Sequence, residues 1–325
     1  MKFSLNSLIA ATLVAMTAGA FAQVAKPEIF KPKVTRALTA EQAKAAAAAA
    51  QLPVVPPAAS EPAPIQLPEL SVDEIINRNI AARGGLAAWR NVQTLTYEGK
   101  LDAGHERVDG GMITRSRMEM KAAEHKAAAQ SALKPAPEPK VLQLPFRLDL
   151  AREHRMRLEI PFAGDTALQV YDGKQGWKLR PFLGRREIEN YTDAESRIAA
   201  SEPDLDGPLM GYREKGIRVE TDGAQRLSGR DTYRLKLTLP GGEVRHVWID
   251  AQTFLEASVE GAPRMFDGRP HSVTTSFSDY RPVAGLQIPR ALETRVNGQR
   301  EVQRLVIERV TINPVLDAQR FAKPA

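Results

Sequence analysis

Apolar side chains recur at every second position through much of this chain, and that period constrains the fold more than any other feature of the sequence. Residues 146–151 and 155–160 alternate apolar with charged or polar side chains, and Met118 and Met120 alternate with charged neighbours in the same way. Successive side chains of a β-strand point to opposite faces, so the pattern predicts strands with one buried and one solvated face. Further stretches of this kind occupy 235–239, 247–249, 273–277 and 302–312.

Short glycine-containing segments separate the alternating stretches and predict turns. Asn297-Gly298 is a typical hairpin dipeptide, because both residue types tolerate the positive φ of a tight turn. About ten strands follow one another without a regular alternation of helix and strand, which favours an antiparallel meander over a βαβ design. The sequence therefore predicts a mainly β protein with an antiparallel sheet. The other turn signals are Asp109-Gly110-Gly111, Asp172-Gly173 and Pro240-Gly241-Gly242.

One amphipathic helix is predicted ahead of the strands. Ser71 and Glu74 have the spacing of a capping box, and Leu70 with Ile75 has the spacing of a hydrophobic staple. Gly84-Gly85 supplies a stop signal at the other end. The apolar side of this helix is expected to consist of Ile76, Ile80, Leu86 and Trp89.

The N-terminal residues 1–22 have the pattern of a removable signal peptide. Lys2 precedes an apolar stretch from Leu8 to Met16, and Ala20-Phe21-Ala22 fits the small-residue rule for a cleavage site. The apolar stretch is shorter than the roughly 20 residues that span a bilayer. The chain has no cysteine, which excludes disulfides and a lipid anchor on such a residue. We therefore expect an exported, soluble, unlipidated protein of the periplasm.

Composition divides the rest of the chain into segments. Residues 23–69 are rich in alanine and proline and hold too few large apolar side chains to offset the entropy of ordering, so they predict a disordered tether. Residues 70–325 are expected to form one domain, with a loop inserted at about 121–143. Residues 193–216 combine a short helical stretch with Pro203, Gly207 and Pro208, and we interpret them as a possible lid.

The chain is basic, with a formal net charge of +6, so nucleic acid, anionic membranes and acidic proteins are candidate partners. We do not expect nucleic acid as the partner, because the protein is predicted to be exported. The basic residues are also interspersed with acidic ones along the predicted strands, as a solvated outer sheet face requires. Peripheral contact with an anionic membrane is the alternative interpretation.

Two strings resemble metal sites, and each lacks a ligand. His105-Glu106 followed by Asp109 has no second histidine and lies at a predicted hairpin, not on a helix. A second string matches the first half of an EF-hand loop, but Arg213 stands where the bidentate glutamate is required. We predict no metal site from either. The second string consists of Glu202, Asp204, Asp206 and Gly207.

Catalytic motifs are missing as well. The sequence has no nucleotide-binding fingerprint and no nucleophile elbow, and its histidines are widely spread. Without cysteine there is no thiol nucleophile. A pair of catalytic carboxylates that meet only in space stays open from sequence. We predict a protein that is not an enzyme and needs no cofactor.

Four groups of turn and packing motifs stand out between residue 70 and the C-terminus. They are Ala81-Ala82-Arg83-Gly84-Gly85 with Trp89 and Thr94-Leu95, Val170-Tyr171-Asp172-Gly173 with Gly176-Trp177, Asp204-Leu205-Asp206-Gly207-Pro208-Leu209, and Phe277-Ser278-Asp279-Tyr280 with Gly285-Leu286 and Pro289. These motifs resemble those of the LolA/LolB-like outer-membrane lipoprotein-sorting proteins, in particular a wider branch of that superfamily, and the tether and the inserted loop depart from it. The resemblance implies a curved antiparallel sheet, a half-open barrel, whose concave face is covered by a few helices and shelters acyl chains.

An apolar concave face of this kind suits an acyl chain, and flexible methionines would make its wall adaptable. The alternative is that the same side chains are core residues packed under a helix. The candidate cavity residues are Met118, Met120, Leu148, Met156, Leu158, Trp177, Leu235, Leu237 and Val247.

Two functions follow from these expectations. The first is a periplasmic binding or carrier protein for lipid acyl chains or a lipidated protein, with outer-membrane lipoprotein sorting as one role of this kind. The second is an envelope module that docks a protein partner or senses stress with the same half-barrel, while the tether supplies reach.

Overall fold

The computed structural model describes residues 65, 67–105, 141–202, 204–266, 268–299 and 302–324. The predicted signal peptide, nearly all of the predicted tether and most of the predicted insertion lie outside these residues. The candidates Met118 and Met120 also lie outside them, as do Glu106 and Asp109 of the histidine string. Residues 141–143, which we expected to end the insertion, belong to a strand.

Thirteen strands of the described residues form one antiparallel sheet, in the order β6-β5-β4-β3-β2-β1-β13-β12-β11-β10-β9-β8-β7. The mainly β, antiparallel prediction is confirmed. The bounds of the strands are β1 Thr94–His105, β2 Val141–Ala151, β3 Arg155–Phe162, β4 Asp165–Tyr171, β5 Gly176–Arg180, β6 Arg185–Asn190, β7 Arg218–Leu227, β8 Arg230–Thr238, β9 Val244–Asp250, β10 Glu256–Phe266, β11 Arg269–Val283, β12 Leu286–Val296 and β13 Val302–Ile312.

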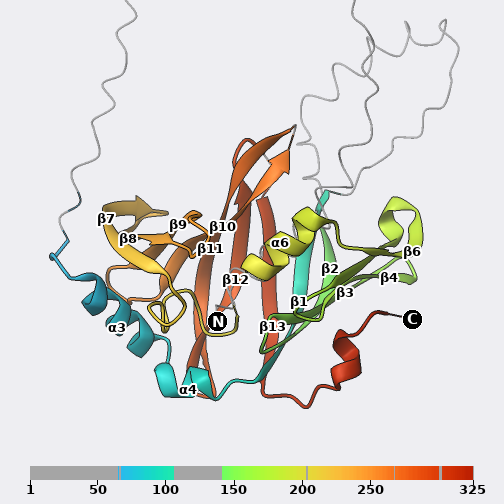
Figure 1. Cartoon of the computed structure of the whole chain (residues 1–325), viewed down its shortest axis with the longest axis horizontal. Helices are drawn as coiled ribbons and strands as arrows, with labels where there is room; N and C mark the ends of the chain where they lie inside the picture. The colour runs from blue at the N-terminus through green and yellow to red at the C-terminus, as the bar shows by residue number, and fades with distance from the viewer. Residues whose placement is uncertain are drawn as a thin grey trace, which may run out of the picture.

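The chain enters this sheet in its middle. It runs outward from β1 to the edge strand β6, passes to the other edge at β7, and returns strand by strand until β13 pairs with β1. Two consecutive meanders therefore lie side by side, and the sheet is curved but not closed, with β7 and β6 at opposite sides of the molecule (Figure 1).

The sequence predicted about ten strands because the edge strands lack a clear alternating pattern. β6 reads Arg-Arg-Glu-Ile-Glu-Asn and has no buried residue, and β7 buries only Val219. An edge strand has a neighbour on one side only, so fewer of its side chains need to be apolar.

Among the described residues, two helices precede the sheet where one was predicted. Helix α3 (Val72–Ala82) begins with the predicted capping box between Ser71 and Glu74. Gly84 and Gly85 have φ values of 108° and 91°, which end this helix, and α4 (Leu86–Arg90) begins directly after them. Leu86 and Trp89 consequently belong to α4 and not to the apolar side of α3.

Short helices between β5 and β7 and after β13 complete the described part of the fold. A short 3-10 helix, η2 (Pro181–Leu183), joins β5 to β6. Helix α6 (Asp193–Ser201) lies in the stretch 193–216 that was predicted to hold a short helix, and Thr192 caps it together with Glu195. A last 3-10 helix, η3 (Ala318–Phe321), follows β13.

The two faces of the sheet differ in character. We call the face that carries Tyr97, Leu148 and Leu158, which are paired across β1, β2 and β3, the inner face. All three are fully buried and belong to one hydrophobic core that extends across the sheet to Leu235 and Val247. Helices α3, α4 and α6 lie on this side in Figure 1. The inner face therefore supplies the core.

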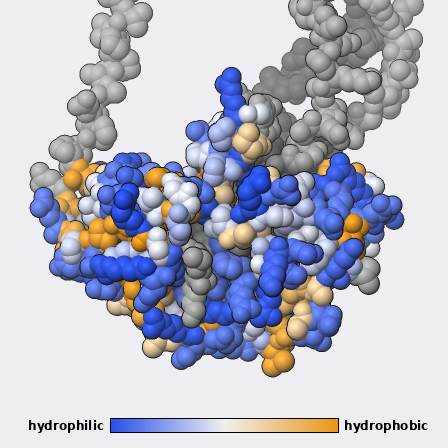
Figure 2. Space-filling model, in the orientation of Figure 1, coloured by the Kyte–Doolittle hydropathy of each residue, from blue (hydrophilic) through white to orange (hydrophobic). Residues whose placement is uncertain are grey.

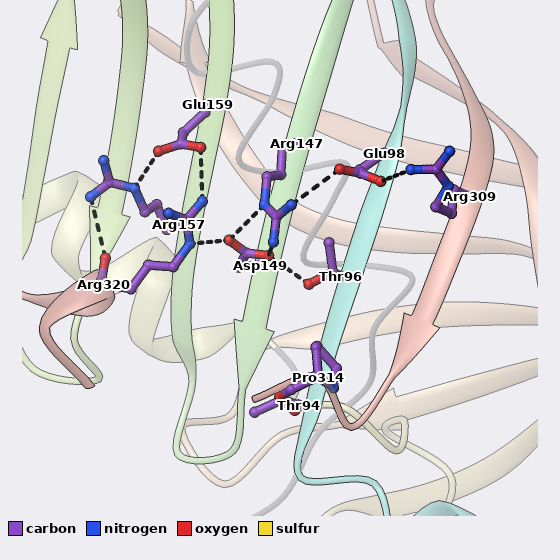
Figure 3. A network of polar contacts seen from close by, with 10 residues as sticks. All are labelled: Thr94, Thr96, Glu98, Arg147, Asp149, Arg157, Glu159, Arg309, Pro314 and Arg320. Carbon is purple, nitrogen blue, oxygen red and sulfur yellow. Dashed lines mark hydrogen bonds and ion pairs between the residues drawn. The ribbon is translucent and has the colours of Figure 1, made fainter. Parts of the chain in front are cut away.

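The outer face carries charged side chains in pairs. Arg147 on β2 lies between Glu98 and Asp149, and Arg309 on β13 contacts Glu98 from the other side (Figure 3). Asp149 has no exposed surface and accepts a hydrogen bond of 2.6 Å from Thr96. Arg320 of η3 contacts Asp149 as well, so this network fixes the C-terminal segment to the outer face.

Candidate ligand-binding site

The predicted cavity residues that the structure describes lie in two groups on the inner face, apart from Trp177. Leu148, Met156 and Leu158 lie on β2 and β3, on one side of the central strands β1 and β13. The other group lies on β8 and β9, toward the opposite edge. It consists of Leu235, Leu237 and Val247. All six are at most 3% exposed and belong to the same hydrophobic core.

Trp177 lies on the other face of the sheet. Its strand partner is Val170, which pairs with Arg157, which in turn lies opposite Asp149 of the outer face. The neighbouring residue Lys178 is the one that shares the inner face with Leu158. Trp177 is buried but does not belong to the surface formed by the other candidates.

Helices and one loop cover the inner face in this structure. Ile75 and Ile76 of α3 and Trp89 of α4 are buried in the core together with the candidate residues. The view of the helix side is mostly hydrophilic, with smaller apolar areas (Figure 2). The loop between α6 and β7 also contributes to this core. Its buried apolar side chains are Leu205, Leu209, Met210 and Ile217.

Helix α6 joins the two halves of the sheet. Glu195 in its first turn receives a hydrogen bond of 2.6 Å from Lys178 on β5, which is next to the edge strand β6. At its other end the Ser201 hydroxyl lies 3.1 Å from Arg245 on β9, in the opposite half. Lys178 and Arg245 are each 5% exposed. We call residues 191–217 the strap, because they cross from one edge of the sheet to the other over its inner face (Figure 1).

A buried polar network holds the loop of the strap. Asp206 lies 2.9 Å from Arg152 and 3.4 Å from Lys215, and Arg152 also lies 3.7 Å from Asp204. The ammonium of Lys215 donates in addition to the carbonyl of Gly207. Burial lowers the pKa of Lys215 to about 8, against the opposing influence of Asp206. These contacts give the loop a fixed position over the core.

The same network explains the string that resembled half of a calcium loop. Asp204 and Asp206 point to Arg152 and Lys215, so cations of the protein occupy the positions that would face a metal ion. Within the part of the chain that the structure describes, no group of three or more histidines and carboxylates has the arrangement of a metal site.

Arg83 connects helix α3 to this network. Its guanidinium lies 3.1 Å from the Glu256 carboxylate, donates a 3.0 Å hydrogen bond to the Asp206 carbonyl, and stacks 4.5 Å from the Trp89 ring. Arg83 and Glu256 are 1% and 2% exposed. Arg83 therefore joins the end of helix α3 to β10 by a buried ion pair and to the strap by a hydrogen bond.

Glu202 is a second buried carboxylate of the strap. It follows the last residue of α6, is 1% exposed, and lies 4.0 Å from Arg245. Burial raises the pKa of Glu202 from 4.5 to about 7, although the charge of Arg245 opposes the shift. The strap thus has a group at its helix end that titrates near neutral pH.

Sequence reasoning missed most of these polar residues. Arg152, Lys215 and Arg245 stand in turns or among other charges, where a solvated position is the ordinary expectation. The one available signal was the pair of aspartates in the strap, which is unusual beside Leu205 and Leu209. Charged residues flanked by apolar ones in a loop indicate that the loop is buried and that partners come from elsewhere.

No protein-family model matches the chain, and no curated protein matches it. Among solved structures, a LolA superfamily protein from Nitrosomonas europaea is 11% identical, with 78% of this chain and 99% of that chain covered and a TM-score of 0.46. A DUF1329 family protein from Desulfovibrio piger is 13% identical, with coverages of 77% and 97% and a TM-score of 0.45.

A domain described as an outer membrane lipoprotein-sorting protein, from Vibrio parahaemolyticus, is also 13% identical, with coverages of 76% and 94% and a TM-score of 0.42. The resemblance predicted from the sequence motifs is thus found among solved structures. At these identities the likeness concerns the course of the chain, and the chemistry rests on this protein's own side chains. In the described residues, no helix has the length and apolar character needed to cross a membrane.

Proposed function

We propose that this protein is a periplasmic carrier for lipid or lipidated cargo, whose acyl chains take the place of the strap on the inner face. The observation that carries the proposal is the strap itself. It covers the apolar inner face of an open sheet and is fastened to the two halves through Lys178 and Arg245. The strap is held by side-chain contacts along its length and is not a strand of the sheet, so it can leave without breaking the pairing between strands.

Burial of the strap's apolar side chains and burial of an acyl chain contribute free energies of similar size. The four buried apolar side chains of the strap contribute on the order of 8 kcal/mol, at roughly 2 kcal/mol for each. Burial of an acyl chain contributes about 0.8 kcal/mol per methylene, so a chain of roughly sixteen carbons supplies about 12 kcal/mol. A long acyl chain can therefore compensate for the contacts that the strap gives up.

The proposal includes action without covalent turnover or a cofactor. The ionisable groups that fix the strap support this, because Asp206 is held in ion pairs with Arg152 and Lys215. Export to the periplasm rests on the N-terminal signal pattern.

The first test is protein purified from the periplasm. We expect native mass spectrometry and organic extraction to show bound acyl species, and a fluorescent polyene fatty acid to bind the delipidated protein. If neither is observed, the carrier function is wrong.

A second test concerns the strap. Glu195→Gln removes the charge that pairs with Lys178, so we expect the fatty-acid probe to bind several-fold more tightly than to the wild type. Glu187→Gln on the edge strand β6 makes the same chemical change away from the strap and serves as the control. Equal affinities in the two variants would show that the strap does not compete with the ligand.

The alternative is an envelope module that docks a protein, and the free edges of the sheet favour it. In the part of the chain that the structure describes, strands β6 and β7 each pair on one side only, and such an edge can add a strand from a partner. A pull-down from envelope extract with delipidated protein distinguishes the two functions. A partner retained without lipid would favour docking over carriage.

A further inference from the structure

Two buried hydrogen-bond donors on the inner face of the central strands lack a partner among the described residues. The Tyr97 hydroxyl on β1 is fully buried, and the structure gives it no hydrogen-bond partner among the described residues. The same is true of the Nε–H of Arg290 on β12, whose Nη1 donates to the Glu308 carbonyl. Buried donors without acceptors are costly in a folded protein and rare in native structures.

The register of the central strands places the two donors on the same face of the sheet, two strands apart, with β13 between β1 and β12. Gly99 pairs with Ile307 across β1 and β13, and Ala291 pairs with Val306 across β13 and β12. Arg290 therefore lies about level with Gly99, two residues along β1 from Tyr97. Its side chain shares the inner face with the flanking Ile288 and Leu292, which are both buried in the core.

The electrostatic surroundings of the Tyr97 hydroxyl are consistent with Arg290 lying near it on the inner face. Burial raises the pKa of the Tyr97 hydroxyl, and the positive charges of Arg83 and Arg290 act against that shift. The hydroxyl thus stays protonated as a donor and lies within the field of two guanidinium groups. An uncharged or anionic oxygen is the acceptor that such a group of donors fits best.

The surroundings indicate what kind of molecule carries that oxygen. Leu148 and Leu158 form an apolar surface on one side of the central strands, and Leu235 and Val247 form another toward the opposite edge. A molecule with two acyl chains that diverge from one linkage matches this order of apolar, polar and apolar surface.

We propose that Tyr97 and Arg290 bind an acyl carbonyl oxygen of a diacyl lipid or diacylated cargo, with its two chains on the two apolar halves of the inner face. This inference rests on the proposed carrier function and names its ligand class. Tyr97 and Arg290 then select for an ester or amide linkage and not only for chain length.

The test compares two glycerolipids with the same chains, a diacylglycerol and its dialkyl ether, which lacks the carbonyl oxygens. Each displaces the fluorescent fatty acid from the delipidated full-length protein. We expect the wild type to prefer the diester about tenfold, as one or two net hydrogen bonds would give. In Tyr97→Phe the preference is expected to fall to about twofold or less.

Tyr233→Phe is the matched control. Tyr233 also lies in the core, but its hydroxyl already donates to the Pro68 carbonyl at 3.2 Å. We expect this variant to keep the diester preference and to be less stable than the wild type. Tyr97→Phe is expected to be at least as stable as the wild type, because it removes a buried hydroxyl without a partner.

The outcomes separate the two proposals. Equal affinity of the wild type for diester and diether, or an unchanged preference in Tyr97→Phe, would overturn the carbonyl site while carriage remains. If neither glycerolipid nor the fatty acid binds, the carrier function fails and the carbonyl site fails with it.

Discussion

The Arg83 guanidinium lies 3.1 Å from the Glu256 carboxylate, and both side chains are almost completely buried. Arg83 ends helix α3, and Glu256 begins β10 in the half of the sheet that leads to the edge strand β7. One ion pair thus fixes the N-terminal helix to the far half of the sheet. Such a pair depends strongly on both partners, because either charge alone is costly in the interior.

We therefore expect Glu256→Gln to lower the free energy of unfolding by about 3–5 kcal/mol, since it leaves Arg83 buried without its counter-charge. Adding Arg83→Met should recover part of that loss. Urea denaturation of both variants and of the single Arg83→Met measures the coupling. Asp73→Asn, in the exposed pair with Arg213, is the control and should have a much smaller effect on stability.

Glu202 should make stability depend on pH near neutrality. Because the pKa of Glu202 is raised, the folded protein holds a proton between about pH 4.5 and pH 7 that the unfolded chain releases. Stability from this group is therefore complete below pH 4.5 and is lost as pH rises through 7, by an amount on the order of 3 kcal/mol.

Glu202→Gln removes this dependence, so the variant should gain stability relative to the wild type as pH rises from 4.5 to 8. Urea denaturation across that range measures the difference. Glu243→Gln changes the other carboxylate beside Arg245, which is 37% exposed, and serves as the control. Parallel pH profiles of wild type and Glu202→Gln would contradict the prediction.

Asp149 should contribute at the acid end of the pH scale. Burial alone would raise its pKa, but hydrogen bonds from Arg147, Thr96 and Arg320 outweigh burial and hold the pKa below its ordinary value of 3.8. Because the pKa of Asp149 is lowered on folding, this group contributes stability that is fully present above pH 3.8 and is lost as pH falls through the pKa of the folded state.

At pH 7 we expect Asp149→Asn to cost about 2–4 kcal/mol and to loosen η3, because Arg320 loses its buried partner. At pH 2 the difference from the wild type should be smaller than at pH 7. Hydrogen exchange of the C-terminal residues together with denaturation at both pH values tests this. Glu293→Gln, in an exposed pair with Arg304, should have little effect at either pH.

Gly84 and Gly85 should differ in their tolerance of a side chain. Both have positive φ, which costs an alanine roughly 1–2 kcal/mol. A Cβ on Gly84 would also collide with the Gly285 carbonyl oxygen, whereas nothing lies within 4 Å of the corresponding position on Gly85. Gly84→Ala should therefore lower the midpoint of thermal unfolding well below that of Gly85→Ala, and equal midpoints would contradict the close approach.

Local elements were predictable because their signals come from residues near one another in the chain. The capping box of Ser71 and Glu74 and the Asn297-Gly298 turn between β12 and β13 are set by a few neighbouring residues. The alternation of Leu148 with Arg147 and Asp149 likewise follows from the geometry of a strand.

The candidate site was only partly predictable, and Trp177 shows why. In the sequence Gly-Trp-Lys-Leu, Trp177 and Leu179 alternate with Lys178, so the pattern favours the lysine on the solvated side. In the structure Lys178 is on the inner face, where Glu195 of the strap neutralises it. The register of β5 on β4 thus gives the opposite orientation to the one that hydrophobicity predicts, and the ion pair with Glu195 makes the buried position of Lys178 tolerable.

By itself, the sequence determined most of the strands, several turns and the capping box of α3, since period and propensity act over a few residues. The tertiary structure alone decided that β13 pairs with β1, that the strap crosses the inner face, and that Tyr97 and Arg290 lie on the same face of the central strands. These features depend on contacts between segments far apart in the chain. Which of those segments meet is decided only when the whole sheet has folded and buried its apolar face.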